Sequence, residues 1–228
     1  MRLRRLLVAA ALLALSPTSA WASGGVWTPV RVAPAVAKGS ADLPRLALES
    51  DSTAVAAWTE NGSVRAATRA PGKAFGAPRA IATSSTLALT DDVVALGTRA
   101  LVLLHAQQGS GATLVASSVT GSSVGPPEQA AATTAPITEA AGALRSDASA
   151  LAVYAVASSP MTISSAARTA AGGWSPAGDV ALPASVTLVQ QLQLALLPDG
   201  SAVLLFLGQG PAAGDVPRPY AALRSAAG

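Results

Sequence analysis

The feature that most constrains the fold is a unit of sequence that occurs four times along the chain. In three copies, an Asp is followed by two small residues and an apolar run that ends in an aromatic residue. These copies are Asp51–Trp58, Asp147–Tyr154 and Asp199–Phe206, and a weaker copy is Thr98–His105. Successive copies lie roughly 50 residues apart, a period typical of small structural units that pack against their neighbours. The repeat predicts one domain built from four similar units.

Each unit has the pattern of short strands joined by tight turns. In the clearest unit, Leu46–Leu48 and the apolar run Thr53–Trp58 predict two strands. Asn61-Gly62 is a hairpin signal, Ser63–Arg69 predicts a third strand, and Phe75 begins a fourth segment. Four strands in about 45 residues are typical of a propeller blade. The sequence therefore predicts an all-β fold, a four-bladed β-propeller of four-stranded blades.

The last unit lacks its fourth strand, and a matching segment precedes the first unit. Gly24-Gly25-Val26-Trp27-Thr28-Pro29 matches Gly172-Gly173-Trp174-Ser175-Pro176, which follows the third strand of the third unit. An N-terminal strand that completes the last blade removes an open sheet edge and holds both ends of the ring together. We therefore expect residues near Trp27 to lie beside those near Tyr220 in one sheet.

The first 22 residues have the pattern of a cleaved signal peptide. Arginines at the start precede the apolar run Leu6–Leu15, and Ala20-Trp21-Ala22 has the small-x-small pattern of a signal-peptidase site. The apolar run is about half the roughly 20 residues that a membrane span needs. We expect residues 1–22 to be removed and residues 23–228 to form a single exported domain without a transmembrane segment. The domain would be secreted, periplasmic or held at the cell surface.

Charge and cysteine content exclude several classes of function. The expected leader holds three of the 15 basic residues, so the remaining chain carries 12 basic and 12 acidic residues. A domain without net charge gives no electrostatic reason to bind nucleic acid. The absence of cysteine excludes disulfides, thiolate catalysis and cysteine-based metal sites. We expect no metal and no cofactor.

The clearest unit, Pro44–Pro78, carries a family resemblance. It has the pattern P-x-L-A, then D-x-x-A-x-A-x-W, then V-R-A-A-T-R-x-P-G-x-x-F-G-x-P. This resembles secreted bacterial tandem-repeat β-propeller proteins that are sialidase-like in shape, and partial matches cover the rest of the chain after the leader. The resemblance implies a propeller of repeated four-stranded units. No unit meets the sialidase Asp-box S-x-D-x-G-x-T-W in full, so the resemblance implies shape rather than activity.

Three arginines that recur near the ends of the third strands are the candidate ligand-binding residues. Arg69, Arg168 and Arg224 could together clamp a carboxylate or a phosphate, because a guanidinium group binds such anions through paired hydrogen bonds. The alternative is structural, since a residue repeated once per blade is typical of an ion pair on the rim.

The other chemistry-bearing residues have structural interpretations. His105, the single histidine, is in the slot of Trp58, Tyr154 and Phe206, which favours packing over the alternative of a general base or metal ligand. Gly121–Gly125 matches the G-x-S-x-G elbow of hydrolases but has no histidine downstream. Asp91-Asp92 is interpreted as part of a loop between units. The other stretches interpreted as loops are Ala33–Ala41, Ala130–Ala143 and Gly208–Pro219.

These interpretations leave no set of catalytic residues. We expect an exported, non-catalytic β-propeller that binds an unknown protein or polysaccharide. One alternative is a sialidase-like glycan hydrolase, active or degenerate, in which the three arginines converge with an acid on one face. Another is a structural subunit that forms a homodimer and so assembles a larger propeller.

Overall fold

The computed structural model describes residues 41–82, 88–212 and 214–226. The regular secondary structure of these residues consists of β-strands alone. Every strand pairs antiparallel with a strand next to it in sequence. None of the described segments forms a helix that is long and apolar enough to cross a membrane. The predicted all-β class is confirmed. The expected leader lies outside the described residues.

The strands form four sheets, which are named here in chain order. The first sheet contains β1 (Ala41–Leu48), β2 (Ala54–Glu60), β3 (Ser63–Arg69) and β4 (Arg79–Ala82). The second contains β5 (Ala88–Leu96), β6 (Arg99–Gln108), β7 (Gly111–Thr120) and β8 (Ser123–Thr133). The third contains β9 (Ile137–Leu144), β10 (Ala150–Val156), β11 (Thr162–Arg168) and β12 (Trp174–Val180). The fourth contains β13 (Leu188–Leu196), β14 (Ala202–Gln209) and β15 (Arg218–Arg224).

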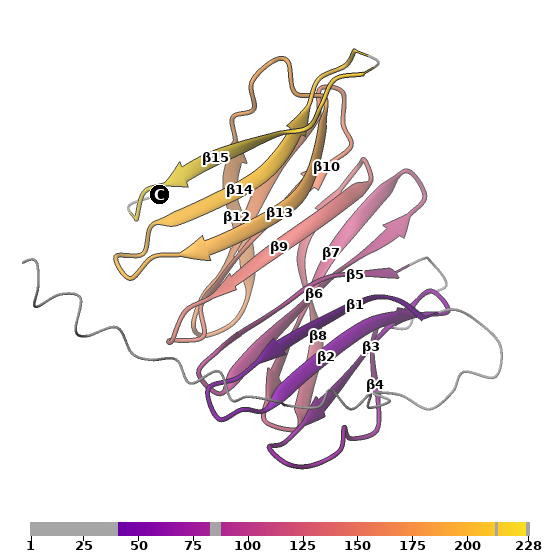
Figure 1. Cartoon of the computed structure of the whole chain (residues 1–228), viewed down its shortest axis with the longest axis vertical. Helices are drawn as coiled ribbons and strands as arrows, with labels where there is room; N and C mark the ends of the chain where they lie inside the picture. Colours follow the sequence, from indigo (N-terminus) through magenta and orange to yellow (C-terminus); the bar gives the residue numbers. More distant parts are fainter. Residues whose placement is uncertain (1–40, 83–87, 213, 227–228) are drawn as a thin grey trace, which may run out of the picture. The chain divides into compact units, whose positions relative to one another are not determined.

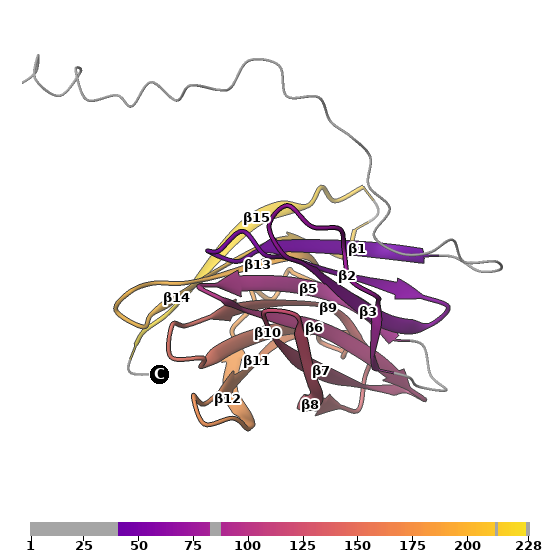
Figure 2. The same cartoon turned by 90° about the horizontal axis from the view of Figure 1, so that it is seen from below.

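The first strands of the four sheets lie in a row, because β1 contacts β5, β5 contacts β9 and β9 contacts β13 (Figure 1). Within each sheet the remaining strands follow outward in chain order. Figure 2 shows the second and third sheets extending away from the row of first strands toward β8 and β12. This is the blade arrangement of a β-propeller, and the prediction of four blades is confirmed. No contact of comparable extent joins β13 to β1 among the described residues.

One turn recurs between the first and second strands of three sheets. In each copy an Asp carboxylate accepts a hydrogen bond from the backbone N–H two residues later, at 2.8–2.9 Å. The donors to Asp51, Asp147 and Asp199 are Thr53, Ser149 and Ser201. The repeated Asp thus acts as a turn residue. In the second sheet the two residues Gly97 and Thr98 make a shorter connection between β5 and β6.

The core consists of apolar layers between successive sheets. Val55, Val64 and Val102 belong to the layer between the first and second sheets, and Leu103, Leu114 and Tyr154 to the layer between the second and third. The layer between the third and fourth sheets includes Val153, Ile163 and Phe206. The second strands of the two middle sheets, β6 and β10, contribute to the layers on both of their faces, and all seven residues of β10 are buried. This explains why the second strands are continuous apolar runs.

Several expectations from the sequence need correction. Ala130–Ala143 is not a loop, because it contains the end of β8 and most of β9. Asp91-Asp92 lies within β5 rather than in a loop. Alanine carries a weak strand signal, and its small side chain suits the close packing between sheets. The N-terminal strand expected to complete the last blade lies outside the described residues, within which the fourth sheet has three strands.

Candidate functional site

The first strand of each sheet contains a bulge that interrupts its pairing with the second strand. The register shifts between Asp42 and Arg45 in β1, between Thr90 and Asp92 in β5, and between Gln190 and Gln193 in β13. In β9 it shifts beside Glu139. An extra residue at a bulge redirects side chains and breaks strict alternation. The bulges therefore bring polar side chains together where the first strands of neighbouring blades meet.

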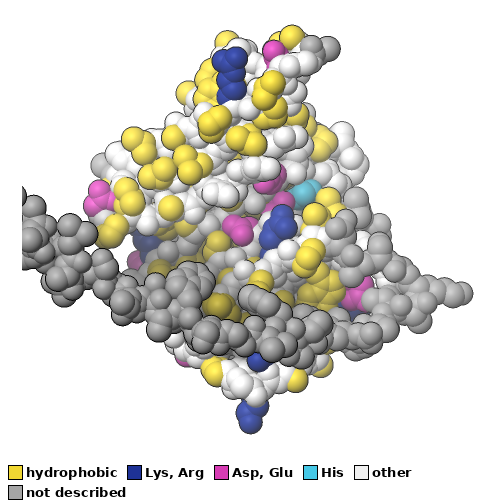
Figure 3. Space-filling model, viewed as in Figure 1, with side chains coloured by type: hydrophobic (Ala, Val, Ile, Leu, Met, Phe, Trp, Pro, Cys, Tyr) yellow, Lys and Arg dark blue, Asp and Glu magenta, His cyan; other side chains and the backbone are white. Residues whose placement is uncertain are grey.

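We call these polar residues the axial cluster, and it consists of Arg45, Asp91, Asp92 and Glu139. Each of the three neighbouring strands β1, β5 and β9 contributes at least one member. Figure 3 shows acidic side chains, a basic side chain and the single histidine gathered near the middle of the face that it presents. Elsewhere on this face apolar and uncharged side chains predominate, so the cluster is a distinct polar region.

Asp91 is the most deeply buried acid of the axial cluster. Its two carboxylate oxygens lie 2.9 and 3.0 Å from Nδ1 of His105, and both side chains are buried. Burial raises the pKa of Asp91, while the contact with His105 opposes this effect. Arg45 Nε donates a hydrogen bond to the Asp91 carbonyl oxygen at 2.7 Å, which joins β1 to β5. His105 thus lies behind the cluster as the partner of Asp91.

Asp92 and Glu139 each accept hydrogen bonds from the backbone of the next blade. Asp92 Oδ2 accepts from the N–H of Gly142 at 3.0 Å, and Glu139 accepts from the N–H groups of Gln191 and Leu192 at 2.6 and 3.1 Å. Burial raises the pKa of both acids, and the charge of Asp91 raises the pKa of Glu139 further. These contacts tie β5 to β9 and β9 to β13.

The axial cluster therefore combines a structural role with the composition of an acid–base site. Its contacts join each first strand to the next, which fixes the positions of the acids. It also gathers three carboxyl groups whose pKa values are raised, and such groups concentrate at functional sites. A neutral carboxyl beside an ionised one can act as general acid and general base. The described residues contain no group of three or more acids, histidines or cysteines arranged to hold a metal ion.

The three candidate arginines lie at matching positions in three different sheets. Each is opposite an alanine of the second strand. Arg69 Nε donates to the carbonyl oxygen of Lys73, and Arg168 forms a bidentate ion pair with Glu128 of the second sheet. Arg224 lines a pocket between the third and fourth sheets. The structure does not gather them around the axial cluster, and their ligand-binding role stays a prediction.

The remaining sequence motifs have structural positions. Trp58, His105, Tyr154 and Phe206 are all buried in second strands, as expected for one repeated slot. The G-x-S-x-G match at Gly121–Gly125 is the turn between β7 and β8 and the start of β8. It does not lead into a helix, so it lacks the geometry of a nucleophile elbow.

Sequence reasoning missed the axial cluster because its members are not adjacent in the chain. Asp91-Asp92 was visible as the one adjacent acidic pair, but its assignment to a loop removed it from consideration. Glu139 lies in the alanine-rich stretch that was also interpreted as a loop. Aligning the four units would have placed both segments on first strands, and this was the available signal.

No family model and no curated protein matches the chain. Among solved structures it is similar to the α-L-arabinanase of Penicillium chrysogenum in complex with arabinobiose, with a TM-score of 0.55 and 12% identity over 79% of this chain and 61% of that one. It also matches a GH43 endo-arabinanase from Bacillus licheniformis, with a TM-score of 0.49 and 11% identity over 79% of this chain and 69% of that one. The chain thus spans less than two thirds of the first enzyme, and the likeness concerns the fold.

These comparisons correct the expectation of a non-catalytic binding propeller. The α-L-arabinanase with the similar fold is an enzyme, so the expectation of a non-catalytic propeller gives way to the alternative of a glycan hydrolase, which is taken up below as a proposal. The physical reason for the error is that two strands carrying acids were assigned to loops, so that no carboxylate set was recognised. The propeller fold itself agrees with the sequence-based expectation.

Proposed function

We propose that the chain is a glycoside hydrolase that cleaves a polysaccharide of the arabinan type at the axial cluster. The observation that carries the proposal is the gathering of three acids, the buried Asp91 and the half-buried Asp92 and Glu139, whose pKa values are raised. The arabinanase activity of the similar propeller from Penicillium chrysogenum suggests the substrate class.

Hydrolysis of a glycosidic bond needs one carboxylic acid and one carboxylate. The acid protonates the leaving oxygen, and the carboxylate either activates water or attacks the sugar. We assign the acid role to Glu139, because burial and the charge of Asp91 both keep its proton bound. Backbone N–H groups oppose the effect of burial at both acids, and we assign the base role to Asp92 because the charge of Asp91 raises the pKa of Glu139 alone. Asp91 acts on Glu139 through its charge and is held by His105.

The test is the release of reducing sugar from arabinan, xylan and their oligosaccharides by the purified chain. We expect Glu139→Gln and Asp92→Asn to lower the rate by about 10²- to 10⁴-fold, the usual contribution of a positioned acid or base. Asp147→Asn is the matched control, because Asp147 is an exposed turn acid at the other end of the β9–β10 hairpin. Circular dichroism verifies folding of each variant. Failure of the unmodified chain to cleave any of these glycans, or full activity of Glu139→Gln, contradicts the proposal.

Export fits an enzyme that acts on polysaccharides, because such substrates are met outside the cytoplasm. The signal pattern at residues 1–22 supports export. We expect protein collected outside the producing cells to begin at residue 23. N-terminal sequencing checks this, and an intact Met1 on the exported protein is the opposing result.

A further inference from the structure

Within the described part of the chain, the fourth sheet has an open edge where each of the other sheets has a fourth strand. Its strand order ends at β15, whereas β4, β8 and β12 complete the first three sheets. Leu223 on β15 is 82% exposed, the highest value among the large apolar residues of the described chain. An edge strand presents backbone N–H and C=O groups that can pair with another strand. The edge of β15 is therefore a site for an added strand.

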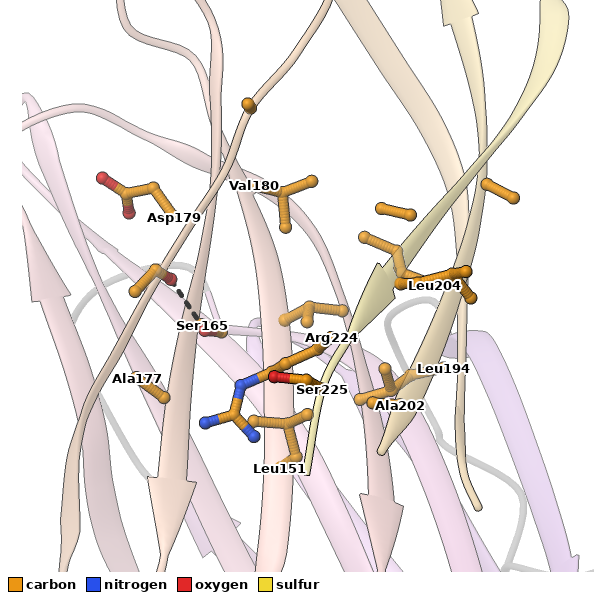
Figure 4. Close-up of a pocket in the computed structure, with 16 residues that line it drawn as sticks. Leu151, Ser165, Ala177, Asp179, Val180, Leu194, Ala202, Leu204, Arg224 and Ser225 are labelled. Atoms are coloured by element: carbon orange, nitrogen blue, oxygen red, sulfur yellow. Dashed lines mark hydrogen bonds between the residues drawn. The ribbon is translucent and has the colours of Figure 1, made fainter. Parts of the chain in front are cut away.

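A pocket of about 680 Å³ lies between the third and fourth sheets, next to this edge. One wall comes from β10, β11 and β12, and the other comes from β13, β14 and β15. In Figure 4, Arg224 extends from β15 toward the strands of the third sheet, and Leu204 and Ala202 lie on its other side, on β14. The lining is mixed, with Asp179 and Arg224 among apolar side chains.

The third sheet shows what fills the equivalent space. Its fourth strand, β12, begins at Trp174, which pairs with Arg168 of β11. Trp174 packs against the apolar layer between the second and third sheets, a layer that includes Ala150, Ala152 and Ala166. In the third sheet, the aromatic side chain of the fourth strand thus fills the space between this sheet and the second sheet.

The repeat identifies the matching positions in the fourth sheet. Ala202 pairs with Arg224 as Ala150 pairs with Arg168, so the two sheets share one register. The equivalents of Ala150, Ala152 and Ala166 are Ala202, Leu204 and Ala222. All three line the pocket. The pocket therefore occupies the place where the fourth sheet lacks a counterpart of Trp174.

We propose that the edge of β15 and this pocket bind residues 24–29 of the chain as a fourth strand, with the Trp27 side chain in the pocket. These residues lie outside the described part of the chain, and their sequence repeats the segment that begins β12, with Trp-Thr-Pro in place of Trp-Ser-Pro. Transferring the register of β11 and β12 places Trp27 opposite Arg224, Thr28 opposite Leu223 and Pro29 opposite Ala222. Proline suits the outermost strand of a sheet, where its missing N–H faces solvent. The proposal is independent of the hydrolase activity.

Engineered cysteines test the register directly, because the chain has no cysteine of its own. Residues directly opposite each other in an antiparallel pair have the Cα separation that a disulfide requires. We expect Thr28→Cys with Leu223→Cys to form an intramolecular disulfide under mild oxidation. The matched pair Thr28→Cys with Ala221→Cys is offset by two residues and should cross-link poorly. Equal cross-linking of the two pairs, or disulfide-linked dimers in place of the intramolecular bond, overturns the proposal.

A second measurement does not depend on cysteines. Trp27→Ala should remove the hydrogen-exchange protection of amides in β15 and lower the thermal midpoint, while amides of β6 keep their protection. Trp174→Ala is the matched variant, and it should weaken protection of β11 instead. If Trp27→Ala leaves the exchange of β15 unchanged, residues 24–29 do not bind this edge.

Discussion

At the residue scale, the carboxyl group of Glu49 is buried and accepts no hydrogen bond from any described residue. Glu49 directly follows β1 and is 3% exposed. Neither of its carboxylate oxygens has a hydrogen-bond partner among the described residues. Burial raises its pKa, and the nearby charge of Asp51 adds to the effect. The folded protein therefore holds this proton more tightly than the unfolded chain, and ionised Glu49 opposes folding.

We expect Glu49→Gln to raise the free energy of unfolding at neutral pH. The gain should shrink as the pH falls below the raised pKa of Glu49 and disappear below the ordinary pKa of a glutamate, because Glu49 is then protonated in the folded and in the unfolded state. Urea unfolding at a series of pH values measures this. Asp199→Ala is the control of opposite sign, because hydrogen bonds from Ser201 lower the pKa of Asp199 and its charge supports the fold above that pKa. A Gln variant that is no more stable at any pH contradicts this account of Glu49.

The burial of single residues could be predicted from the sequence more readily than their contacts. The repeated aromatic slot identified four buried positions, including His105, because burial in a repeated unit depends on local pattern. The partner of His105 was not predictable, because Asp91 contacts it only through the bulge in β5. Glu49 has no sequence signal at all, since the equivalent positions after β5 and β9 hold Gly97 and Arg145.

At the scale of elements, strands were easier to predict than the irregularities within them. The third strand at Ser63–Arg69 matches its predicted bounds, since hairpin turns mark its ends in the sequence. Bulges depend on pairing between two strands, and two of them contain non-glycine residues with positive φ, Leu43 at 50° and Gln191 at 56°. Neither residue type signals such a backbone. The candidate site is built on these bulges, which is why the fold could be predicted further than the site.

At the scale of the whole molecule, side-chain contacts between residues far apart in sequence join neighbouring blades. The ion pair between Arg168 in the third sheet and Glu128 in the second is bidentate, at 2.8 and 2.9 Å, and both side chains are partly buried. The hydrogen bond from Arg168 lowers the pKa of Glu128. This pairing therefore stabilises the fold above the ordinary pKa of Glu128, and the contribution is lost as the pH falls through the lowered value.

We expect a double-mutant cycle of Arg168→Met and Glu128→Gln to give a coupling energy of about 1 kcal/mol at neutral pH. The coupling should vanish in acid once Glu128 is protonated. The cycle of Arg65 and Glu60 is the comparison, because that single contact lies within the first sheet and Arg65 is more exposed, so we expect a smaller value. Equal coupling energies at neutral and acidic pH would show that the Arg168 contact is not ionic.

The row of first strands has a consequence for the order in which the blades unfold. The hydrogen bonds of three side chains each link one blade to the next blade in the chain. These side chains are Arg45, Asp92 and Glu139, so each described blade is stabilised by its immediate neighbours. A row of blades stabilised in this way unfolds from its ends, because within the described residues a terminal blade packs against one neighbour and a middle blade against two. Heat or denaturant should therefore release the blade of β13 to β15 while the two middle blades still protect each other, and partial melting would begin far from the longest strands.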